Sequence, residues 1–404
     1  MAIIVRMVEI PKEFHEALPI LQKIESAGYE AYFVGGSVRD TILKRPIHDV
    51  DIATSAYPSE VKALFKRTVD TGIEHGTVMI LDHGTGYEVT TFRTESGYQD
   101  YRRPDHVTFV RSLKEDLKRR DFTINALALA ENGQVTDLFG GLSDMRKHII
   151  RAVGDPNERF NEDALRMMRA VRFASQLDFK IEDATLAGIA LHSQLLAKIA
   201  VERSHTEFVK MMLGSDANHG LKIMIQTNLY QHVPILGEHL DQLRQIADTD
   251  FTLTNEVQVW ALLAFKFGFN SQQITRFLKR WKTANKIIND VILTVELLFA
   301  IQRGQVTNLT LYHAGSENVD NAIAVFADQS KTTGLSERYN RLAIKNKHQL
   351  KITGGELIKR GVLKPSPQLG QVLNYLEQNV VADKINNEPE DLVQAAINFL
   401  NEDW

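Results

Sequence analysis

Apolar and polar residues alternate in two different ways along the chain. Before about residue 150, short runs rich in valine, isoleucine, threonine and aromatic residues are bounded by glycine, proline or aspartate, as in "EAYFVGG", "HDVDIAT", "GTVMILD", "GYEVTTF" and "HVTFV". Such runs are typical of strands. Beyond residue 150, apolar residues recur at spacings of three and four, which indicates helices. The pattern predicts an α+β protein, in which a mixed sheet with helices precedes an all-α region.

Three segments are predicted to be individual helices. Residues 11–28 begin with Pro11 and stop at Gly28, as helices commonly do. Residues 159–177, "RFNEDALRMMRAVRFASQL", are expected to form one continuous helix. The run "DFTINALAL", which follows two arginines, is expected to be an apolar helix capped by Asp121 or Thr123.

The expected helix over residues 159–177 has one strongly polar side. Polar residues step by three around one half of the cylinder, while apolar residues occupy the other half; the polar ones are Asp163, Arg166, Arg169 and Arg172. One interpretation is a surface helix with an ion pair between Asp163 and Arg166, worth only a few tenths of a kcal/mol, on the order of 0.2–0.5. The other is a binding site.

Composition limits the class of protein. A chain of 404 residues exceeds the size of one usual core, so two or more domains are expected. No run of 18 apolar residues and no leader-like segment occurs, which predicts a protein without a membrane span. The absence of cysteine excludes disulfides and thiolate chemistry, and a cytoplasmic location is the simplest expectation. The net charge of -4 still allows a local basic patch.

Residues 33–54, "FVGGSVRDTILKRPIHDVDIAT", contain the first candidate chemistry. Asp49 and Asp51 are two apart, so in a strand both carboxylates would project from the same face. Paired carboxylates repel one another unless a cation lies between them, and oxygen ligands alone favour Mg²⁺ over zinc. Gly35 and Gly36 end the preceding strand and open a helix, where a bare backbone and Arg39 could contact phosphate. The alternatives are an ordinary turn and solvated acids at a sheet edge.

Further candidates lie downstream of this stretch. Glu88 falls in a predicted strand that could lie beside Asp51 and complete a metal site, although a surface acid is nearly as good an interpretation. The segment from Arg93 to His106 lacks periodicity and is expected to be a loop at the rim of a site. Arg120 and its neighbour Arg119 could pair with a triphosphate or be merely solvated.

At this point the ordered motifs resemble those of a known family. "VGGSVRD", "HDVDIATSA", "TGIEHGTVMI", "YEVTTFR", "RRDFTINALAL", "DLFGGLSDM" and "DPNERFNEDALRMMRAVRFA" are similar to the class II CCA-adding enzymes, the tRNA nucleotidyltransferases of the polymerase beta superfamily. Later helical parts resemble the bacterial form without a phosphohydrolase domain. The resemblance implies four regions: a catalytic nucleotidyltransferase head (1–150), a neck that recognises the base (151–212), a helical body (213–282) and a helical tail that binds tRNA (283–404).

The resemblance also implies an activity and residue roles. The activity is template-independent addition of C, C and A to the 3′ end of tRNA from CTP and ATP, with release of pyrophosphate. Asp49 and Asp51 would be catalytic and would hold two Mg²⁺ ions. The nucleotide would contact Gly36, Arg39, Arg120, Asp163, Arg166, Arg169 and Arg172. Asp163 would accept from the amino group shared by cytosine and adenine, and Arg166 would donate to the neighbouring ring nitrogen or carbonyl, by analogy with base-edge readout. The loop after Arg93 would take part in the change from C to A.

RNA binding is expected in the helical half. Residues 266–289 contain six lysines or arginines and no acid, with phenylalanine and tryptophan interleaved. The aromatic residues fit a core better than an RNA surface, whereas the basic ones are either solvated or track phosphates. A homodimer is a further possibility. The remaining alternatives are a poly(A) polymerase, a CC-adding enzyme and an inactive tRNA-binding protein.

Overall fold

The computed structural model describes residues 3–47, 49–99, 101 and 103–402, apart from 7–9. The chain forms two compact units, Met1–Asp248 and Thr249–Trp404. Unit 1 contains a mixed sheet followed by helices, and unit 2 is helical in its described residues. The predicted α+β class is therefore confirmed. The finer division into head, neck, body and tail stays a prediction.

The sheet of unit 1 has eight strands in the order β1-β10-β9-β2-β3-β6-β5-β4. Neighbouring strands are antiparallel except β3 and β6, which are parallel. The strands are β1 Ile3–Arg6, β2 Ala31–Val34, β3 Asp51–Thr54, β4 Thr68–Gly72, β5 Thr77–Asp82, β6 Thr85–Thr91, β9 Leu127–Leu129 and β10 Gln134–Asp137. The runs "AYFV", "GTVMILD" and "GYEVTTF" are thus confirmed as strands.

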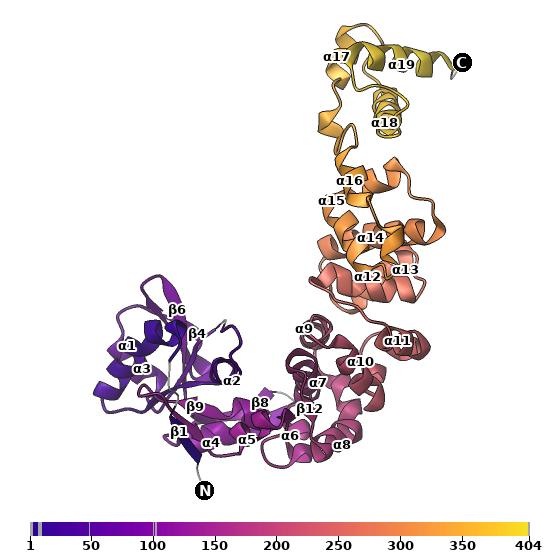
Figure 1. The fold of residues 1–404 in the computed structure, drawn as a ribbon. Coiled ribbons are helices and arrows are strands. Elements are labelled where there is room, and N and C mark those ends of the chain that lie inside the picture. The colour runs from indigo at the N-terminus through magenta and orange to yellow at the C-terminus, as the bar shows by residue number, and fades with distance from the viewer. Residues whose placement is uncertain (1–2, 7–9, 48, 100, 102, 403–404) are drawn as a thin grey trace. The chain divides into compact units, whose positions relative to one another are not determined.

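Helix α1 (Lys12–Ser26) supports this sheet. Its buried residues Phe14, Ala17, Leu21 and Ile24 recur at spacings of three and four, as the sequence predicted. They pack toward β2, and α1 and α3 (Pro58–Leu64) lie together beside the sheet (Figure 1). The other helices of the head region are α2 Gly36–Ile42, α4 Leu113–Lys118 and α5 Gly141–Arg146.

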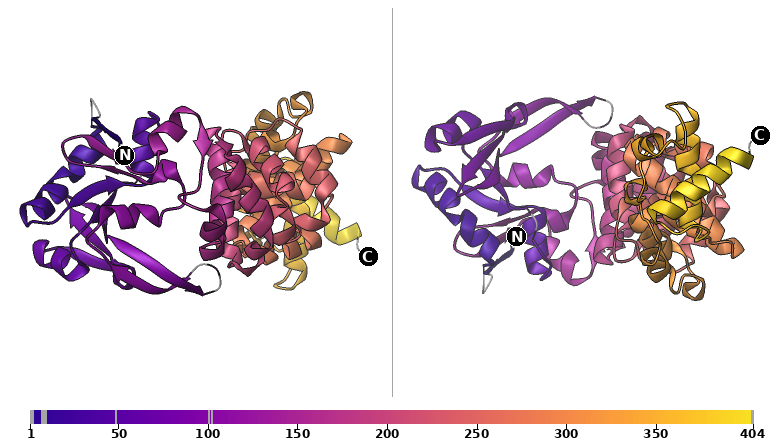
Figure 2. Two further views of the ribbon diagram at one scale, coloured as in Figure 1. Left: turned by 90° about the horizontal axis from the view of Figure 1, so that it is seen from below. Right: turned by 90° about the horizontal axis from the view of Figure 1, so that it is seen from above.

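Two expectations about this region are wrong. The run "DFTINALAL" is not a helix: a 3₁₀ turn, η2 (Thr123–Asn125), leads into β9, whose three residues are completely buried between β10 and β2. A short apolar run fits a buried strand as well as a helix, because a strand covered on both faces shows no alternation. The expected rim loop is also ordered: β7 (Arg93–Gln99) and β8 (Arg103–Phe109) form an antiparallel ribbon, seen in purple in Figure 2.

Helices complete unit 1 beyond a short parallel pair, β11 (Ile149–Ile150) and β12 (Lys180–Ile181). They are α6 Pro156–Glu162, α7 Leu165–Leu177, α8 Asp183–His192, α9 Val201–Met212, α10 Ala217–Gln226 and α11 Leu240–Ala247. The helix predicted as continuous over residues 159–177 is therefore interrupted: it comprises the end of α6 and all of α7. The chain breaks at Asp163, which has an extended backbone with φ -137° and ψ 98°.

Unit 2 contains eight α-helices in its described residues: α12 Glu256–Lys266, α13 Ser271–Arg280, α14 Asn285–Arg303, α15 Asn308–Val325, α16 Leu335–Asn340, α17 Gly354–Lys359, α18 Gln368–Val381 and α19 Pro389–Glu402. Trp260, Phe277 and Trp281 are completely buried among α12–α14, so the interleaved aromatic residues belong to the core. A second core joins α17–α19 (Figure 1). No helix in the described parts of either unit is long and apolar enough to span a membrane.

Candidate active site

Three adjacent strands bring the glycine turn and two acids together. In the sheet register, Val34 at the end of β2 pairs with Asp51, and Asp51 pairs with Glu88 on the parallel strand β6. Gly35 follows Val34 with φ +75°, a backbone conformation that favours glycine, and turns the chain into α2. Because β2 ends there, residues before Asp51 have no partner in β2.

Asp49 is therefore placed differently from the expectation. It lies before β3 rather than within it, and its side chain is exposed. The two carboxylates still belong to one site, because both line a cavity of about 490 Å³ with Glu88, Glu13 and the ring of Tyr87. The side chain of Asp51 is also exposed, but desolvation by the surrounding protein and the neighbouring Glu88 raise its pKa, with Asp49 adding to the rise and Arg120 opposing it. This crowding of negative charge is what a bound cation would relieve.

A second cavity, of about 820 Å³, lies on the other side of Asp51. We call it the arginine cavity, because eight arginines line it: Arg39, Arg93, Arg119, Arg120, Arg166, Arg169, Arg172 and Arg203. Gly35, Gly36, Asp121, Asn125, Asp163 and Phe173 complete much of its wall. All of the nucleotide-binding residues predicted from the sequence thus share one cavity with Asp51. Their roles stay a prediction.

Gly35 allows Arg120 and Asp51 to approach the backbone. A Cβ at Gly35 would lie 3.3 Å from Nη1 of Arg120 and 3.7 Å from Oδ2 of Asp51. At Gly36 the nearest atom would be Nη2 of Arg39, at 3.6 Å. A side chain at position 35 would therefore crowd the boundary between the two cavities, and it would also be strained by the positive φ.

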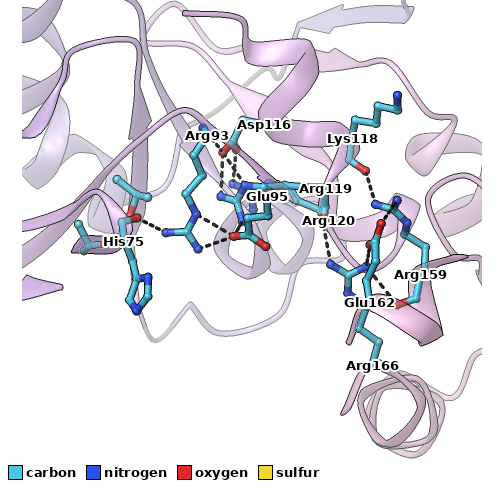
Figure 3. Close-up of polar contacts among 12 residues, drawn as sticks. His75, Arg93, Glu95, Asp116, Lys118, Arg119, Arg120, Arg159, Glu162 and Arg166 are labelled. Carbon is cyan, nitrogen blue, oxygen red and sulfur yellow. Dashed lines mark hydrogen bonds and ion pairs between the residues drawn. The ribbon is translucent and has the colours of Figure 1, made fainter. Parts of the chain in front are cut away.

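Two arginines of the cavity are positioned by a buried aspartate. No sequence pattern pointed to this residue. Asp116 is 1% exposed; its Oδ1 accepts from Arg119 at 2.8 Å and its Oδ2 from Arg120 at 3.2 Å (Figure 3). Burial raises the pKa of Asp116, but the two arginines more than offset this and hold it below the usual range. Nε of Arg120 is buried without a hydrogen-bond partner, which leaves a donor unused in the cavity wall.

The β7–β8 ribbon closes part of the arginine cavity. Glu95 on β7 accepts from Arg93 at 2.9 Å and from Arg119 at 3.3 Å, and Arg93 also donates to the carbonyl oxygen of His75 (Figure 3). At the turn of the ribbon, the carbonyl oxygen of Tyr101 accepts from the backbone N–H of Ala164 at 3.0 Å. The ribbon therefore contacts both the head and the break between α6 and α7.

The break between α6 and α7 separates the residues expected on one helical face. Asp163 caps α7, since its Oδ1 accepts from the N–H of Leu165 at 3.0 Å. Arg166 donates to Glu162 at 3.1 Å and to the carbonyl oxygen of Arg119 at 2.9 Å (Figure 3). Burial raises the pKa of Asp163 to about 6, although Arg166 lowers it.

Long-range contacts hold the other arginines. Asp121 accepts from Arg169 at 2.8 Å and from Asn125 at 3.0 Å, and Asn125 in turn accepts from Arg39 at 2.8 Å. Arg172 forms an ion pair of 2.9 Å with Glu207 on α9. These acids could not be found from sequence periodicity, because they lie tens of residues from the arginines that they hold.

The described residues contain no cluster of three or more histidine, aspartate or glutamate side chains arranged to hold a metal. Asp51 and Glu88 nevertheless stand at paired positions of adjacent strands, with Asp49 in the same cavity wall. These carboxylate oxygens are of the type that Mg²⁺ prefers.

Comparisons with known proteins match almost the whole chain. The family model described as the poly A polymerase head domain matches residues 31–151. A probable RNA and SrmB-binding site of polymerase A matches residues 178–240, and a putative domain 2 of tRNA nucleotidyltransferase matches residues 251–396. The CCA-adding enzyme of Pediococcus pentosaceus is 55% identical over 400 residues, which cover 98% of this chain and 100% of that protein.

The chain belongs to the CCA-adding enzymes. The CCA-adding enzyme of Limosilactobacillus fermentum is 54% identical over 96% of this chain and 97% of its own length. The crystal structure of the Bacillus stearothermophilus CCA-adding enzyme in complex with CTP is 39% identical and has a TM-score of 0.86, with 98% and 99% of the two chains covered. Sequence and fold therefore support the same family, including the head whose model is named for poly(A) polymerases.

Proposed function

We propose that the arginine cavity binds CTP or ATP beside Mg²⁺ held at Asp49 and Asp51, and that the enzyme joins the nucleotide to the 3′ end of tRNA. The chain belongs to a family of nucleotidyltransferases that add C, C and A to tRNA. The residue assignment rests on the position of Asp51. This residue lines both the arginine cavity and the cavity that contains Asp49 and Glu88. A nucleotide in the arginine cavity would thus lie against the carboxylates.

The carboxylates supply the negative charge that a metal requires. Asp51 and Glu88 are opposite one another in adjacent strands, and Asp49 raises the pKa of Asp51 further. Bound Mg²⁺ would lower the pKa of the attacking 3′-hydroxyl and neutralise the charge that develops on the triphosphate. Members of this superfamily typically depend on metal.

The glycine turn and the arginines fit a triphosphate. Gly35 and Gly36 leave bare backbone between Asp51 and the arginines, so phosphate oxygens could approach closely. Arg120 lines the same cavity, with its guanidinium group next to Gly35. In contrast, Arg39 donates to both carboxylate oxygens of Asp40 and to Asn125, so it acts as a partly neutralised charge. The attacking hydroxyl would displace pyrophosphate from the α-phosphorus, and the arginines would stabilise the negative charge of the pyrophosphate.

Asp163 and Arg166 fit the selection of cytosine and adenine. Both bases place an amino donor beside a ring-nitrogen acceptor, whereas uracil and guanine place a carbonyl beside an N–H. An ionised Asp163 can accept from the amino group only, since a carboxylate has no proton to donate. Arg166 is fixed by Glu162 and the carbonyl oxygen of Arg119 and still has N–H donors for a base.

Unit 2 supplies a candidate surface for the RNA backbone. Five basic side chains of α13 and the start of α14 are exposed, and the aromatic residues between them are buried; the basic ones are Arg276, Lys279, Arg280, Lys282 and Lys286. We call this set the basic face. Exposed lysines and arginines of this kind bind nucleic-acid phosphates, and this binding releases the counterions condensed on the nucleic acid. A homodimer and a cytoplasmic location stay predictions.

Replacing either catalytic aspartate tests the assignment. We expect Asp49→Ala and Asp51→Ala to abolish incorporation of both CTP and ATP, because the metal loses its ligands, while tRNA affinity stays within about twofold of the wild type. Incorporation is measured by primer extension on tRNA without its CCA end, and affinity by filter binding. Asp82→Ala, at the end of β5, is the control and should remain active. Incorporation retained by the Asp51 variant would rule out the proposed metal site.

A further inference from the structure

Phe173 lies among the guanidinium groups of the arginine cavity. It is the ninth residue of α7, is 4% exposed and lines the cavity. Three guanidinium carbons lie within cation–π distance of its ring centroid: Arg172 at 4.3 Å, Arg39 at 4.9 Å and Arg169 at 5.4 Å. One aromatic ring therefore contacts three of the cations predicted to bind the nucleotide.

The ring connects cations that come from different parts of unit 1. Arg39 belongs to α2 in the head, whereas Arg169 and Arg172 belong to α7, the helix of Phe173 itself. Phe122 packs edge-on against the ring, with centroids 5.9 Å apart and planes at 86°. This edge-to-face contact fixes the plane of Phe173, so its faces have a defined orientation toward the arginines.

Three like charges in a small volume repel one another, although each guanidinium group has one acidic partner. Asp40 pairs with Arg39, Asp121 with Arg169 and Glu207 with Arg172. Burial lowers the pKa of Arg172 to about 10, Glu207 opposes this, and the charges of Arg169 and Arg39 contribute to the decrease. Nε of Arg172 is also buried without a hydrogen-bond partner. The three guanidinium groups are therefore each paired with an acid, yet they remain next to one another in the wall of the arginine cavity.

An aromatic ring suits this position better than an aliphatic side chain. Leucine would fill a similar space, but it offers no negative π face to attract a guanidinium group. Without that attraction, Arg39, Arg169 and Arg172 would retain their acidic partners but could move apart under their mutual repulsion. Preorganised cations bind an anion more tightly than mobile ones, because less ordering is required on binding.

We propose that Phe173 is a positioning residue for nucleotide binding, whose ring holds Arg39, Arg169 and Arg172 together to receive the phosphates and sugar common to CTP and ATP. This inference rests on the proposed nucleotide site. It predicts that Phe173 acts on both nucleotides alike and does not choose the base, which we assign to Asp163 and Arg166.

Three variants separate this role from ordinary packing. Phe173→Leu removes the π face, and Phe173→Tyr retains it. Phe160→Leu is the matched control, because Phe160 is a completely buried phenylalanine on the neighbouring helix α6 and does not line the arginine cavity. We measure KM and kcat for CTP and ATP, equilibrium binding of both nucleotides, the midpoint of thermal unfolding and incorporation of UTP.

We expect Phe173→Leu to raise KM and the dissociation constant about tenfold for both nucleotides, by loss of cation–π contacts, with kcat changed less than about threefold. Phe173→Tyr should restore wild-type values to within about threefold. Phe160→Leu should lower the unfolding midpoint without raising KM. In a double-mutant cycle, Phe173→Leu and Arg172→Gln should raise KM by less than the product of their separate effects, because the ring acts through Arg172.

Four results would overturn the proposal: an unchanged KM in Phe173→Leu, an equal rise in Phe160→Leu, an effect on one nucleotide only, or admission of UTP. A folded Phe173→Tyr with the KM of Phe173→Leu would also contradict it. Wild-type protein and Asp51→Ala are assayed in parallel. If the wild type fails to extend tRNA, or Asp51→Ala remains active, the proposed function fails, whereas equilibrium binding still tests Phe173.

Discussion

At the scale of single residues, Asp163 has the most consequential protonation state. Burial raises the pKa of its carboxyl group to about 6, from an ordinary value of 3.8. Its Oδ1 already accepts from the N–H of Leu165, so the carboxyl group is oriented as well as buried. Reading an amino group requires the ionised form, which is lost as pH falls through about 6.

We predict that CTP binding depends on this ionisation. Below pH 6, wild-type affinity for CTP should fall by up to about tenfold per pH unit, because the protonated carboxyl no longer matches the amino group. Asp163→Asn should lack this loss of CTP affinity below pH 6. It should also incorporate relatively more UTP, since its amide can donate to a carbonyl. Equilibrium binding of a non-hydrolysable CTP analogue from pH 5 to 8 checks this prediction. The phosphates of the analogue titrate alike in both experiments, so the difference between the two proteins reports on residue 163. Identical pH profiles would contradict the role of Asp163.

The same shift predicts an effect on stability. Because the folded-state pKa of about 6 exceeds 3.8, the folded protein binds this proton more tightly, and stability falls as pH rises between those values. Above pH 6 the ionised group costs about 3 kcal/mol. Asp163→Asn should therefore raise the free energy of unfolding at pH 8 and change it much less at pH 4. Urea unfolding at both pH values measures the change in the free energy of unfolding. An equal change at pH 4 and pH 8 would exclude the ionisation of Asp163 as its cause.

The sequence revealed the cavity residues better than their partners. The i, i+3 spacing of Arg166, Arg169 and Arg172 correctly predicted that they would lie together, since helical periodicity is local information. The acids that hold them are remote: Asp121 is 48 residues from Arg169. Such pairs arise only when the head sheet and α7 pack together, so no single-sequence pattern contains them.

At the scale of elements, the β7–β8 ribbon couples the head to the break before α7. Burial raises the pKa of Glu95, but Arg119 and Arg93 more than offset this, so it lies below the ordinary value. The pairs therefore stabilise the fold at neutral pH and weaken as pH falls through that lowered pKa. The segment looked like a loop because it contains Gly97 and charged residues. Ion pairs of Glu95 with Arg93 in the same strand and with Arg119 just after α4 make these charged residues compatible with an ordered ribbon.

We predict that Glu95→Gln loosens this ribbon. Loss of charge-assisted hydrogen bonds to Arg93 and Arg119 should cost about 1.5–3 kcal/mol. Amide hydrogen exchange in β7 and β8 should accelerate about tenfold or more, whereas amides of β5 and β6 in the same molecule serve as the internal control. Unchanged exchange in the ribbon would show that Glu95 does not hold it.

Other elements differ in how well their patterns define them. Helix α1 was predictable because its buried spacing and both of its ends agree. The interruption at Asp163 was not, since "NEDALRMM" has no glycine or proline and continues the helical period. The break follows from tertiary contacts instead: Tyr101 binds the N–H of Ala164, and Asp163 caps α7.

At the scale of the whole molecule, the proposed catalytic site and the basic face belong to different compact units. Every residue assigned to the nucleotide lies in Met1–Asp248, and the basic face lies in Thr249–Trp404. Length and composition predicted more than one domain, and the run of basic residues in 266–289 indicated this local positive charge despite the net charge of -4.

We predict that the basic face contributes to tRNA affinity through phosphate contacts. Arg276→Gln with Arg280→Gln should weaken tRNA binding and reduce the slope of log K against log salt by about 1 to 2, because fewer counterions are released. KM for CTP should remain unchanged. The control is Lys12→Gln with Lys66→Gln, two exposed lysines of unit 1. Equal salt slopes in all three proteins would exclude the basic face from phosphate binding.

The most direct test of the whole account is the product that the purified protein makes. Wild-type protein is incubated with Mg²⁺ and tRNA lacking its CCA end, with CTP, ATP, both, or UTP and GTP, and the 3′ ends are sequenced. We predict two C residues with CTP alone, C-C-A followed by arrest with both nucleotides, and no extension with UTP and GTP. A poly(A) tail, arrest at C-C with both nucleotides present, or no extension at all would contradict the account.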